Sequence, residues 1–208
     1  MTALRRQERP LQVGVVGLGT GTMAAYSRPG DHWVFYEIDS EVVRIARTGA
    51  WFSYLEDARP TPSIVLGDAR VSLAREAPRG FDLIVLDAFS SDAIPIHLIT
   101  REAFDLYKRH LAAGGVIAVH VSNRHLVLAP VVARIAEAVG WRAILQVQAT
   151  TPSAAREGIS TSRWLVVAPP DRFESLGLRG PAWRAEVGDG QAPWTDDYSN
   201  LVSVIHWQ

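Results

Sequence analysis

Continuous apolar runs alternate with segments of helical periodicity from the N-terminus to about residue 121. The runs are rich in Val, Ile and Leu, and they predict strands at Gln12–Val16, Trp33–Glu37, Ser63–Leu66, Leu83–Asp87 and Val116–Val121. Helical patterns separate them at Ser40–Thr48, Val71–Glu76 and Ile96–Leu111. Such runs are typical of a parallel sheet that helices cover on both faces, because a strand buried on both sides has no polar face.

The pattern then continues with one more helix and two closing strands. Leu126–Val139 is predicted as a helix that is broken or kinked near Pro130. Ala143–Gln148 and Ser162–Val167 are predicted as strands joined by a polar turn, and Ala168–Pro193, rich in Pro, Gly and charge, as a surface excursion. The chain is thus predicted to be α/β, with a doubly wound, mostly parallel, seven-stranded Rossmann-like sheet in a single domain over residues 1–208.

A glycine-rich turn after the first predicted strand and an acid at the end of the second suggest a nucleoside site. The turn carries Gly17, Gly19 and Gly21, and Glu37 follows 20 positions after Gly17. Glycines let the backbone pass close to a ligand, and a carboxylate accepts hydrogen bonds from both ribose hydroxyls. An ordinary strand-to-helix turn with a surface acid remains the simpler alternative.

The glycine spacing favours one class of nucleoside. A dinucleotide site has the pattern G-x-G-x-x-G, whose third glycine would fall at Thr22. This chain has G-x-G-x-G instead, the form usual in folds that bind S-adenosylmethionine or its relatives. Those ligands carry no pyrophosphate for a helix N-terminus to hold. The spacing therefore favours an adenosyl sulfur compound and leaves NAD as the second choice.

Two more acids follow predicted strands. Asp68 can accept a hydrogen bond from an adenine amino group, or it can simply cap the next helix. Asp87 precedes a small, polar loop that ends at Pro95 and suits a gate over a ligand, although an acid there can also cap a turn. Because ligands of such sheets lie across the carboxyl ends of the strands, one crevice is expected to gather Gly17–Thr22, Glu37, Gly67-Asp68, Asp87 and His120–Asn123.

Composition excludes several other classes of function. A net charge of −1 and a pI near 6.6 argue against a nucleic-acid groove or a basic membrane face. The chain has no cysteine, and its six histidines lack ligand spacing, so no metal is expected. Arg5-Arg6 before the apolar stretch from Leu11 to Tyr26 resembles a twin-arginine signal peptide. The glycine turn and Glu37 fit a nucleotide site in the mature protein better, so this segment is predicted to be part of the fold. A cytoplasmic protein is expected.

The chain resembles the spermidine synthases, and more closely the spermidine-synthase-like proteins often found as the soluble part of larger membrane chains. The resemblance runs from about Val13 to Val121, and a late segment, Thr195–Leu201, is also similar to that subgroup. The segments that carry it are Val13–Thr22, Tyr36–Asp39, Gly67-Asp68, Phe81–Asp87 and Leu98–Phe104.

The resemblance implies a class I methyltransferase fold and transfer of an aminopropyl group to an amine such as putrescine. The co-substrate would be decarboxylated S-adenosylmethionine or S-adenosylmethionine, with no metal. The carboxylate of Asp87 would be the catalytic base that takes the proton from the amine. The implied nucleoside-binding residues are Gly17, Leu18, Gly19, Thr20, Gly21, Glu37, Ile38, Asp68 and Ala69, and the implied amine-binding residues are Ser90, Asp92, Asp197 and Tyr198.

Three departures from the family pattern leave alternatives open. Thr20 stands where spermidine synthases carry an acid, and Ser90 stands where they carry a second one, with Asp92 two places further on. Their N-terminal β-domain has no room before Val13. A small-molecule methyltransferase and a non-catalytic adenosyl-binding domain therefore remain alternatives. A homodimer, and a membrane-domain partner if the chain is a fragment, are left open as partners.

Overall fold

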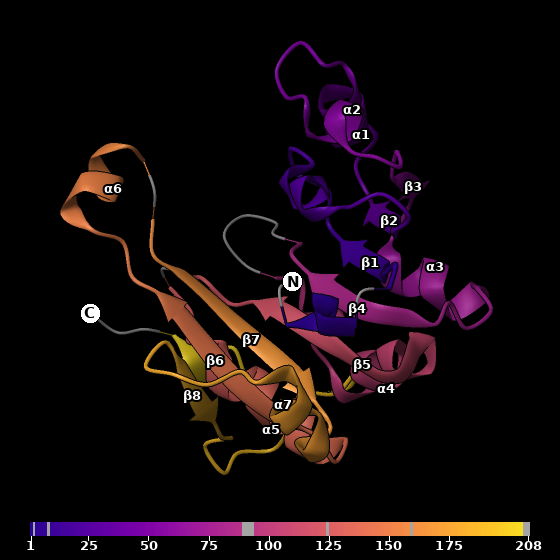
Figure 1. Cartoon of the computed structure of the whole chain (residues 1–208). Coiled ribbons are helices and arrows are strands. Elements are labelled where there is room, and N and C mark those ends of the chain that lie inside the picture. The colour runs from indigo at the N-terminus through magenta and orange to yellow at the C-terminus, as the bar shows by residue number, and fades with distance from the viewer. Residues whose placement is uncertain (2, 8, 89–93, 124, 159, 206–208) are drawn as a thin grey trace. The chain divides into compact units, whose positions relative to one another are not determined.

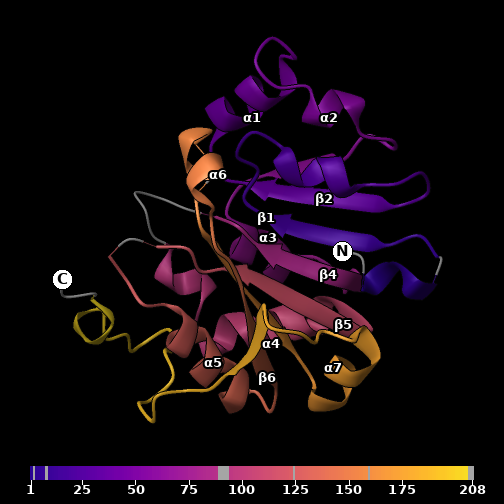
Figure 2. The same ribbon diagram turned by 60° about the vertical axis from the view of Figure 1, so that its left-hand side comes forward.

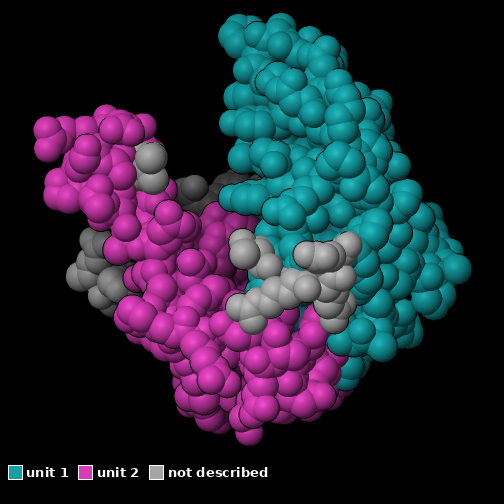
Figure 3. Space-filling model, in the orientation of Figure 1, with its two compact units in different colours: residues 1–89, 105–117 teal, residues 90–104, 118–208 magenta. Residues whose placement is uncertain are grey.

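The computed structural model describes residues 1, 3–7, 9–88, 94–123, 125–158 and 160–205 (Figure 1). The chain forms two compact units, one of residues 1–89 and 105–117 and the other of residues 90–104 and 118–208 (Figure 3). Strand β5, Leu111–His120, and helix α4, Arg101–His110, each have residues in both units. The single domain over residues 1–208 stays a prediction.

The first unit contains a parallel sheet with the strand order β3-β2-β1-β4. Its strands β1, β2 and β4 lie side by side in both views (Figures 1 and 2). The strands are β1 Gln12–Val16, β2 His32–Glu37, β3 Ser63–Leu66 and β4 Phe81–Leu86. The helices are η1 Leu4–Gln7, η2 Thr22–Tyr26, α1 Ser40–Arg47, α2 Tyr54–Asp57 and α3 Ala69–Arg75.

The second unit contains an antiparallel set of strands in the order β7-β6-β8. These strands are β6 Arg142–Gln148, β7 Ser162–Ala168 and β8 Trp183–Glu186. Its helices are η3 Ile96–Leu98, α5 Ala129–Ala138, α6 Pro152–Arg156, α7 Pro170–Leu176 and η4 Val202–Val204. The α/β fold with a mostly parallel sheet is confirmed, with eight described strands rather than seven.

Two local expectations were wrong. Pro130 does not break a helix, because α5 begins at Ala129 and the proline lies in its first turn, where no amide donor is needed. The connection between β6 and β7 contains α6 rather than a polar turn alone. The segment Ala168–Pro193, expected to lie on the surface, is mostly exposed or half-buried and also contains α7 and β8.

Burial explains why the strands of the first unit are continuously apolar. All six residues of β4 are buried, as are four of the five residues of β1. Within β4, Asp82 is a buried acid among apolar neighbours, and Arg9 forms an ion pair with it. Among the described residues, no helix is both long and apolar enough to cross a membrane.

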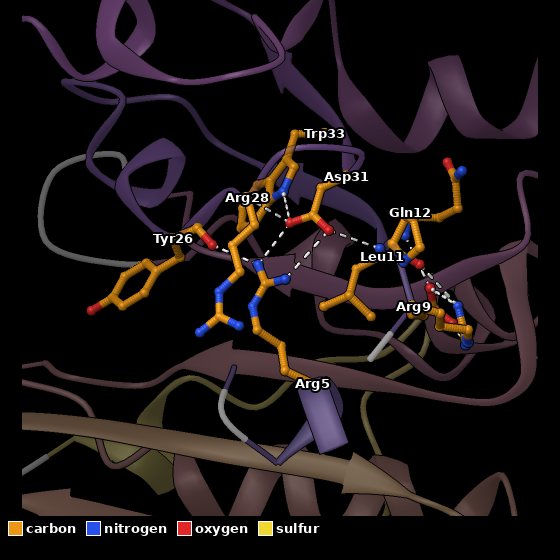
Figure 4. A network of polar contacts seen from close by, with 10 residues as sticks. Arg5, Arg9, Leu11, Gln12, Tyr26, Arg28, Asp31 and Trp33 are labelled. Carbon is orange, nitrogen blue, oxygen red and sulfur yellow. Dashed lines mark hydrogen bonds and ion pairs between the residues drawn. The ribbon is translucent and has the colours of Figure 1, made fainter. Parts of the chain in front are cut away.

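A second buried acid, Asp31, ties the N-terminal segment to the first unit (Figure 4). Its carboxylate accepts hydrogen bonds from the Arg5 guanidinium at 2.7 Å and from the backbone amides of Leu11 and Arg28, each at 2.9 Å. Burial alone would raise the pKa of Asp31, but these hydrogen bonds and one from Trp33 lower it to about 2. The carboxylate is therefore held in its charged form as part of the fold.

Candidate functional site

The glycine turn after β1 packs against the end of β4. Gly17 has φ 95°, and a Cβ atom added to it would lie 2.5 Å from the carbonyl oxygen of Asp87. The Asp87 amide in turn donates to the Val16 carbonyl oxygen at 2.9 Å. Only glycine fits at position 17, and its small size brings the turn and Asp87 together.

Three backbone amides of this turn are used within the protein. Gly17 N–H donates to the Tyr36 carbonyl oxygen, and Gly21 N–H donates to the Leu18 carbonyl oxygen, both at 2.9 Å. Leu18 N–H donates to Oε2 of Glu37, also at 2.9 Å. A phosphate would need those amides and would meet the Glu37 carboxylate. The turn is therefore poorly suited to a pyrophosphate.

Glu37 is held at both of its carboxylate oxygens. Its exposed fraction is 8%, and its Oε1 accepts the backbone amide of Asp39 at 2.9 Å while Oε2 accepts that of Leu18. A carboxylate has about four lone-pair sites, so each oxygen keeps capacity for one more donor. The side chain is preorganised to accept two hydroxyl groups.

Asp68 follows β3 and caps α3, as its simpler interpretation predicted. Its Oδ1 accepts the Val71 amide at 2.8 Å, which satisfies one of the unpaired amides in the first turn of the helix. The neighbouring Gly67 amide donates to the Glu37 carbonyl oxygen at 2.7 Å. This bond places the residue before Asp68 directly beside the end of β2. Capping by one oxygen is compatible with a further contact to a ligand.

Apolar side chains are exposed where β2 and β3 end. Ile38 has an exposed fraction of 70% and Leu66 one of 58%. Ligand sites commonly combine such apolar contact area with a few fixed polar groups, here Glu37 and Asp68. Sequence reasoning named Ile38 but missed Leu66, because a leucine at the end of an apolar run gives no sign that it is exposed.

The described residues of the predicted nucleoside site, together with Asp87, all belong to the first unit. Asp87 is half-buried and follows directly after β4. Ala69 is buried at the start of α3. Ser90 and Asp92, two of the predicted amine-binding residues, lie outside the described residues.

The other two predicted amine-binding residues lie in a turn of the second unit. Thr195 and Tyr198 exchange backbone hydrogen bonds, while Asp197 and Tyr198 are exposed. Asp196, which follows Thr195 in this turn, is hydrogen-bonded to residues at the start of α4. Its Oδ1 accepts the Thr100 hydroxyl at 2.8 Å, and its amide donates to Oε2 of Glu102 at 3.0 Å. The structure thus gives Asp196 an anchoring contact that the sequence did not reveal.

His120, another expected polar residue at a strand end, packs against one aromatic ring of the second unit. Its ring stacks on Trp164 with centroids 4.5 Å apart and planes 7° apart. Its Nε2 lies 2.8 Å from the Ser122 hydroxyl oxygen, which also accepts the Arg163 amide at 2.8 Å. Across the described parts of the chain, no group of three or more His, Cys, Asp or Glu is placed to hold a metal ion.

Sequence comparison finds relatives that are named as polyamine aminopropyltransferases. It is 35% identical over 114 residues to a polyamine aminopropyltransferase of Vibrio vulnificus, and this covers 52% of the chain and 37% of that relative. It is 31% identical over 132 residues to a polyamine aminopropyltransferase of Nitrosomonas europaea, covering 61% and 39%. Over these residues the chain is similar to polyamine aminopropyltransferases.

Similarity to solved structures shows that this chain has the class I methyltransferase fold. A probable spermidine synthase from Corynebacterium glutamicum superposes with a TM-score of 0.66 at 20% identity, covering 96% of this chain and 78% of that one. Human methyltransferase-like protein 13 in complex with SAH superposes with a TM-score of 0.61 at 22% identity, covering 85% of each chain. No family model matches. The chain spans less than two-fifths of the length of the two aminopropyltransferases named above.

Proposed function

We propose that this chain transfers an aminopropyl group from decarboxylated S-adenosylmethionine to a small amine such as putrescine. The names of its relatives support this class of reaction, and the geometry of the first unit supports an adenosyl sulfur compound as co-substrate. A cytoplasmic location, a homodimer and a membrane-domain partner remain predictions from the sequence.

The observation that carries the proposal is the position of Glu37 beside the glycine turn. Both carboxylate oxygens are fixed by backbone amides at 2.9 Å, and the same contact occupies the Leu18 amide that a phosphate would need. A carboxylate at this place suits any ribose, and a turn whose Gly17, Leu18 and Gly21 amides are already bonded favours a nucleoside over a dinucleotide. Ile38, Leu66 and Asp68 would then contact the adenine.

The proposed reaction is a displacement at the propyl carbon next to the sulfonium. The lone pair of the amine nitrogen forms the new C–N bond, the C–S bond breaks, and its electron pair neutralises the sulfur to leave methylthioadenosine. Alkyl amines have pKa values of about 10, so they are mostly protonated near neutral pH and must lose a proton to react. Asp87, close to the turn through Gly17, would attract the cationic amine and accept that proton.

Calorimetry and a product assay test the proposal. The chain is titrated with methylthioadenosine, decarboxylated S-adenosylmethionine and NAD, and methylthioadenosine formation is followed with putrescine as acceptor. Binding of the two adenosyl sulfur compounds with little binding of NAD, together with amine-dependent product, is expected. NAD binding without methylthioadenosine binding would overturn the nucleoside assignment.

A second candidate function is methyl transfer from intact S-adenosylmethionine. The observation that favours it is the end of the glycine turn, where Thr20 and Thr22 present hydroxyls and no carboxylate. Product analysis separates the two reactions, since methyl transfer leaves S-adenosylhomocysteine and aminopropyl transfer leaves methylthioadenosine.

A further inference from the structure

A pocket of the first unit lies where α1, α2 and the start of β3 meet. Its volume is about 450 Å³, which is within the range of small-molecule sites. The helix α1 packs against α2 and β3, and the two helices lie side by side in both views (Figures 1 and 2). Thr61 lines the pocket and precedes β3, whereas Asp68 follows that strand. The pocket therefore lies at the opposite end of β3 from the candidate nucleoside site.

The lining of the pocket combines apolar and charged side chains. Leu55, with an exposed fraction of 6%, and the half-buried Ile64 supply apolar surface, while Arg47, Glu56 and Arg59 are exposed to solvent. None of the residues that line the pocket is a predicted nucleoside-binding or amine-binding residue. Apolar contact area with a few charged groups around it is the usual composition of a ligand site.

Arg59 is held through only one nitrogen of its guanidinium group. Its Nη1 donates to the backbone carbonyl oxygen of Glu56 and, at 2.8 Å, to that of Ala58. Its Nε and Nη2 make no hydrogen bond to any described residue. These two nitrogens form the edge of a guanidinium that binds an oxyanion through two parallel hydrogen bonds. The side chain is thus anchored at one corner and keeps its bidentate edge.

The charge of the second arginine is also not neutralised within the described chain. Arg47 ends α1 and forms no hydrogen bond or ion pair with a described residue, whereas Arg44, on the same helix, pairs with Glu41 at 2.8 Å. Glu56 lines the same pocket, but its carboxylate forms no ion pair with either arginine of the lining. Two guanidinium groups and one carboxylate give the lining a positive net charge, which attracts anions.

We propose that this pocket binds a small molecule that carries an oxyanion, either a phosphate or a carboxylate group. The Nε and Nη2 edge of Arg59 donates to two oxygens of the anion, and Arg47 supplies a second positive charge. The Glu56 carboxylate and the Thr61 hydroxyl accept hydrogen bonds from hydroxyl or ammonium groups of the same molecule. The site goes beyond the proposed transfer reaction and does not depend on it.

Calorimetry at constant ionic strength tests the pocket with two probes, pyrophosphate and succinate. The parent should bind at least one of them, and the tighter of the two shows whether phosphate or carboxylate is preferred. Arg59→Gln should weaken binding by about tenfold or more, because two charge-assisted hydrogen bonds are lost. Arg47→Gln removes one exposed charge and should weaken binding by about twofold to fivefold.

Two further variants separate binding in the pocket from a general effect of surface charge. Arg44→Gln removes a positive charge from the same helix outside the pocket lining, so it should leave probe binding unchanged. Glu56→Gln removes the acid of the lining and should tighten binding by about twofold to fivefold. A change in the fold would not make Arg59→Gln and Glu56→Gln act in opposite directions.

Three results would overturn the proposal. The first is that the parent binds neither probe up to about 10 mM. The second is that Arg59→Gln and Arg47→Gln bind the probes as tightly as the parent, or that Arg44→Gln weakens binding as much as they do. The third is that methylthioadenosine displaces the bound probe, since the anion would then lie at the glycine turn instead of in this pocket.

Discussion

At the scale of single residues, the sharpest test of the nucleoside site is Glu37→Ala. The substitution removes the acceptor of two ribose hydroxyls and leaves the Leu18 and Asp39 amides without their carboxylate partner. We expect methylthioadenosine binding to weaken by roughly 2–4 kcal/mol, measured by calorimetry. Glu41→Ala is the matched control, because Glu41 is an exposed acid of α1 that pairs with Arg44. Equal affinity in Glu37→Ala and the parent would refute the site.

Asp87 is the residue on which the proposed chemistry depends. Asp87→Asn keeps the size and the backbone contact with Val16 but removes the proton acceptor. We expect the transfer rate to fall on the order of a hundredfold or more, with donor affinity nearly unchanged, because the base acts in the transition state. Asp105→Asn, at an exposed position of α4, serves as control. Full turnover by Asp87→Asn would show that another group takes the proton.

At the scale of elements, the sequence predicted the helices and strands whose hydrophobic residues recur with a clear period. The ranges expected for β1 and β3 agree with the structure at both ends, because turn residues follow each of these apolar runs. The sequence analysis did not predict helix α7, because its proline and glycine suggested a loop. Its Pro170 and Gly177 were taken as loop composition, but proline suits the first turn of a helix and Gly177 ends it in the left-handed conformation with φ 60°.

The candidate site was predictable in outline but not in its internal contacts. The glycine spacing and Glu37 predicted the turn as a candidate nucleoside site, and the structure brings the turn and this carboxylate into contact. The sequence could not show that Glu37 already holds the Leu18 amide, or that Asp68 already caps α3. It also could not reveal the bond from Thr100 to Asp196, because 96 positions separate them and nothing local links the two.

The hydrogen bond from the Thr100 hydroxyl to Asp196 holds the segment around Asp196 to the start of α4. Thr100 has an exposed fraction of 1%, and its oxygen accepts the Ala103 amide at 3.2 Å while its proton goes to Asp196. Thr100→Val loses both bonds, so we expect the free energy of unfolding to fall by about 1–2 kcal/mol. Hydrogen exchange of the Asp196 amide should become faster. Asp197→Asn, at an exposed neighbour, should change neither quantity, and unchanged exchange in Thr100→Val would contradict the anchoring role.

At the scale of the whole molecule, buried ionisable groups set how stability depends on pH. The pKa of Asp31 is about 2 in the folded protein and 3.8 unperturbed, so the unfolded chain binds more protons between these values. Stability is therefore complete above about pH 5 and falls as the pH approaches 2. We expect a loss of about 2 kcal/mol over this window that Asp31→Asn does not share, measured by chemical denaturation. Parallel losses in both proteins would show that Arg5 does not hold a charged Asp31.

Protonation of His110 should lower the stability of the fold at a higher pH than protonation of Asp31 does. Its side chain lies at the end of α4 with an exposed fraction of 2%, and its Nδ1 has no hydrogen-bond partner among the described residues. Burial is the main cause that lowers its pKa, and Arg109 and Arg79 lower it further, against the opposing effects of the Leu73 carbonyl and Glu76. The folded protein therefore resists protonation of His110 more than the unfolded chain does.

The consequence is a loss of stability as the pH falls below the unperturbed histidine value of about 6.5. Between pH 7 and pH 5 the melting temperature of the parent should drop more than that of His110→Gln, which cannot titrate. His125→Gln is the matched control, because His125 is exposed, and its melting curve should follow the parent at every pH. If His110→Gln loses as much stability as the parent over this window, then the buried imidazole is not what makes the fold sensitive to mild acid.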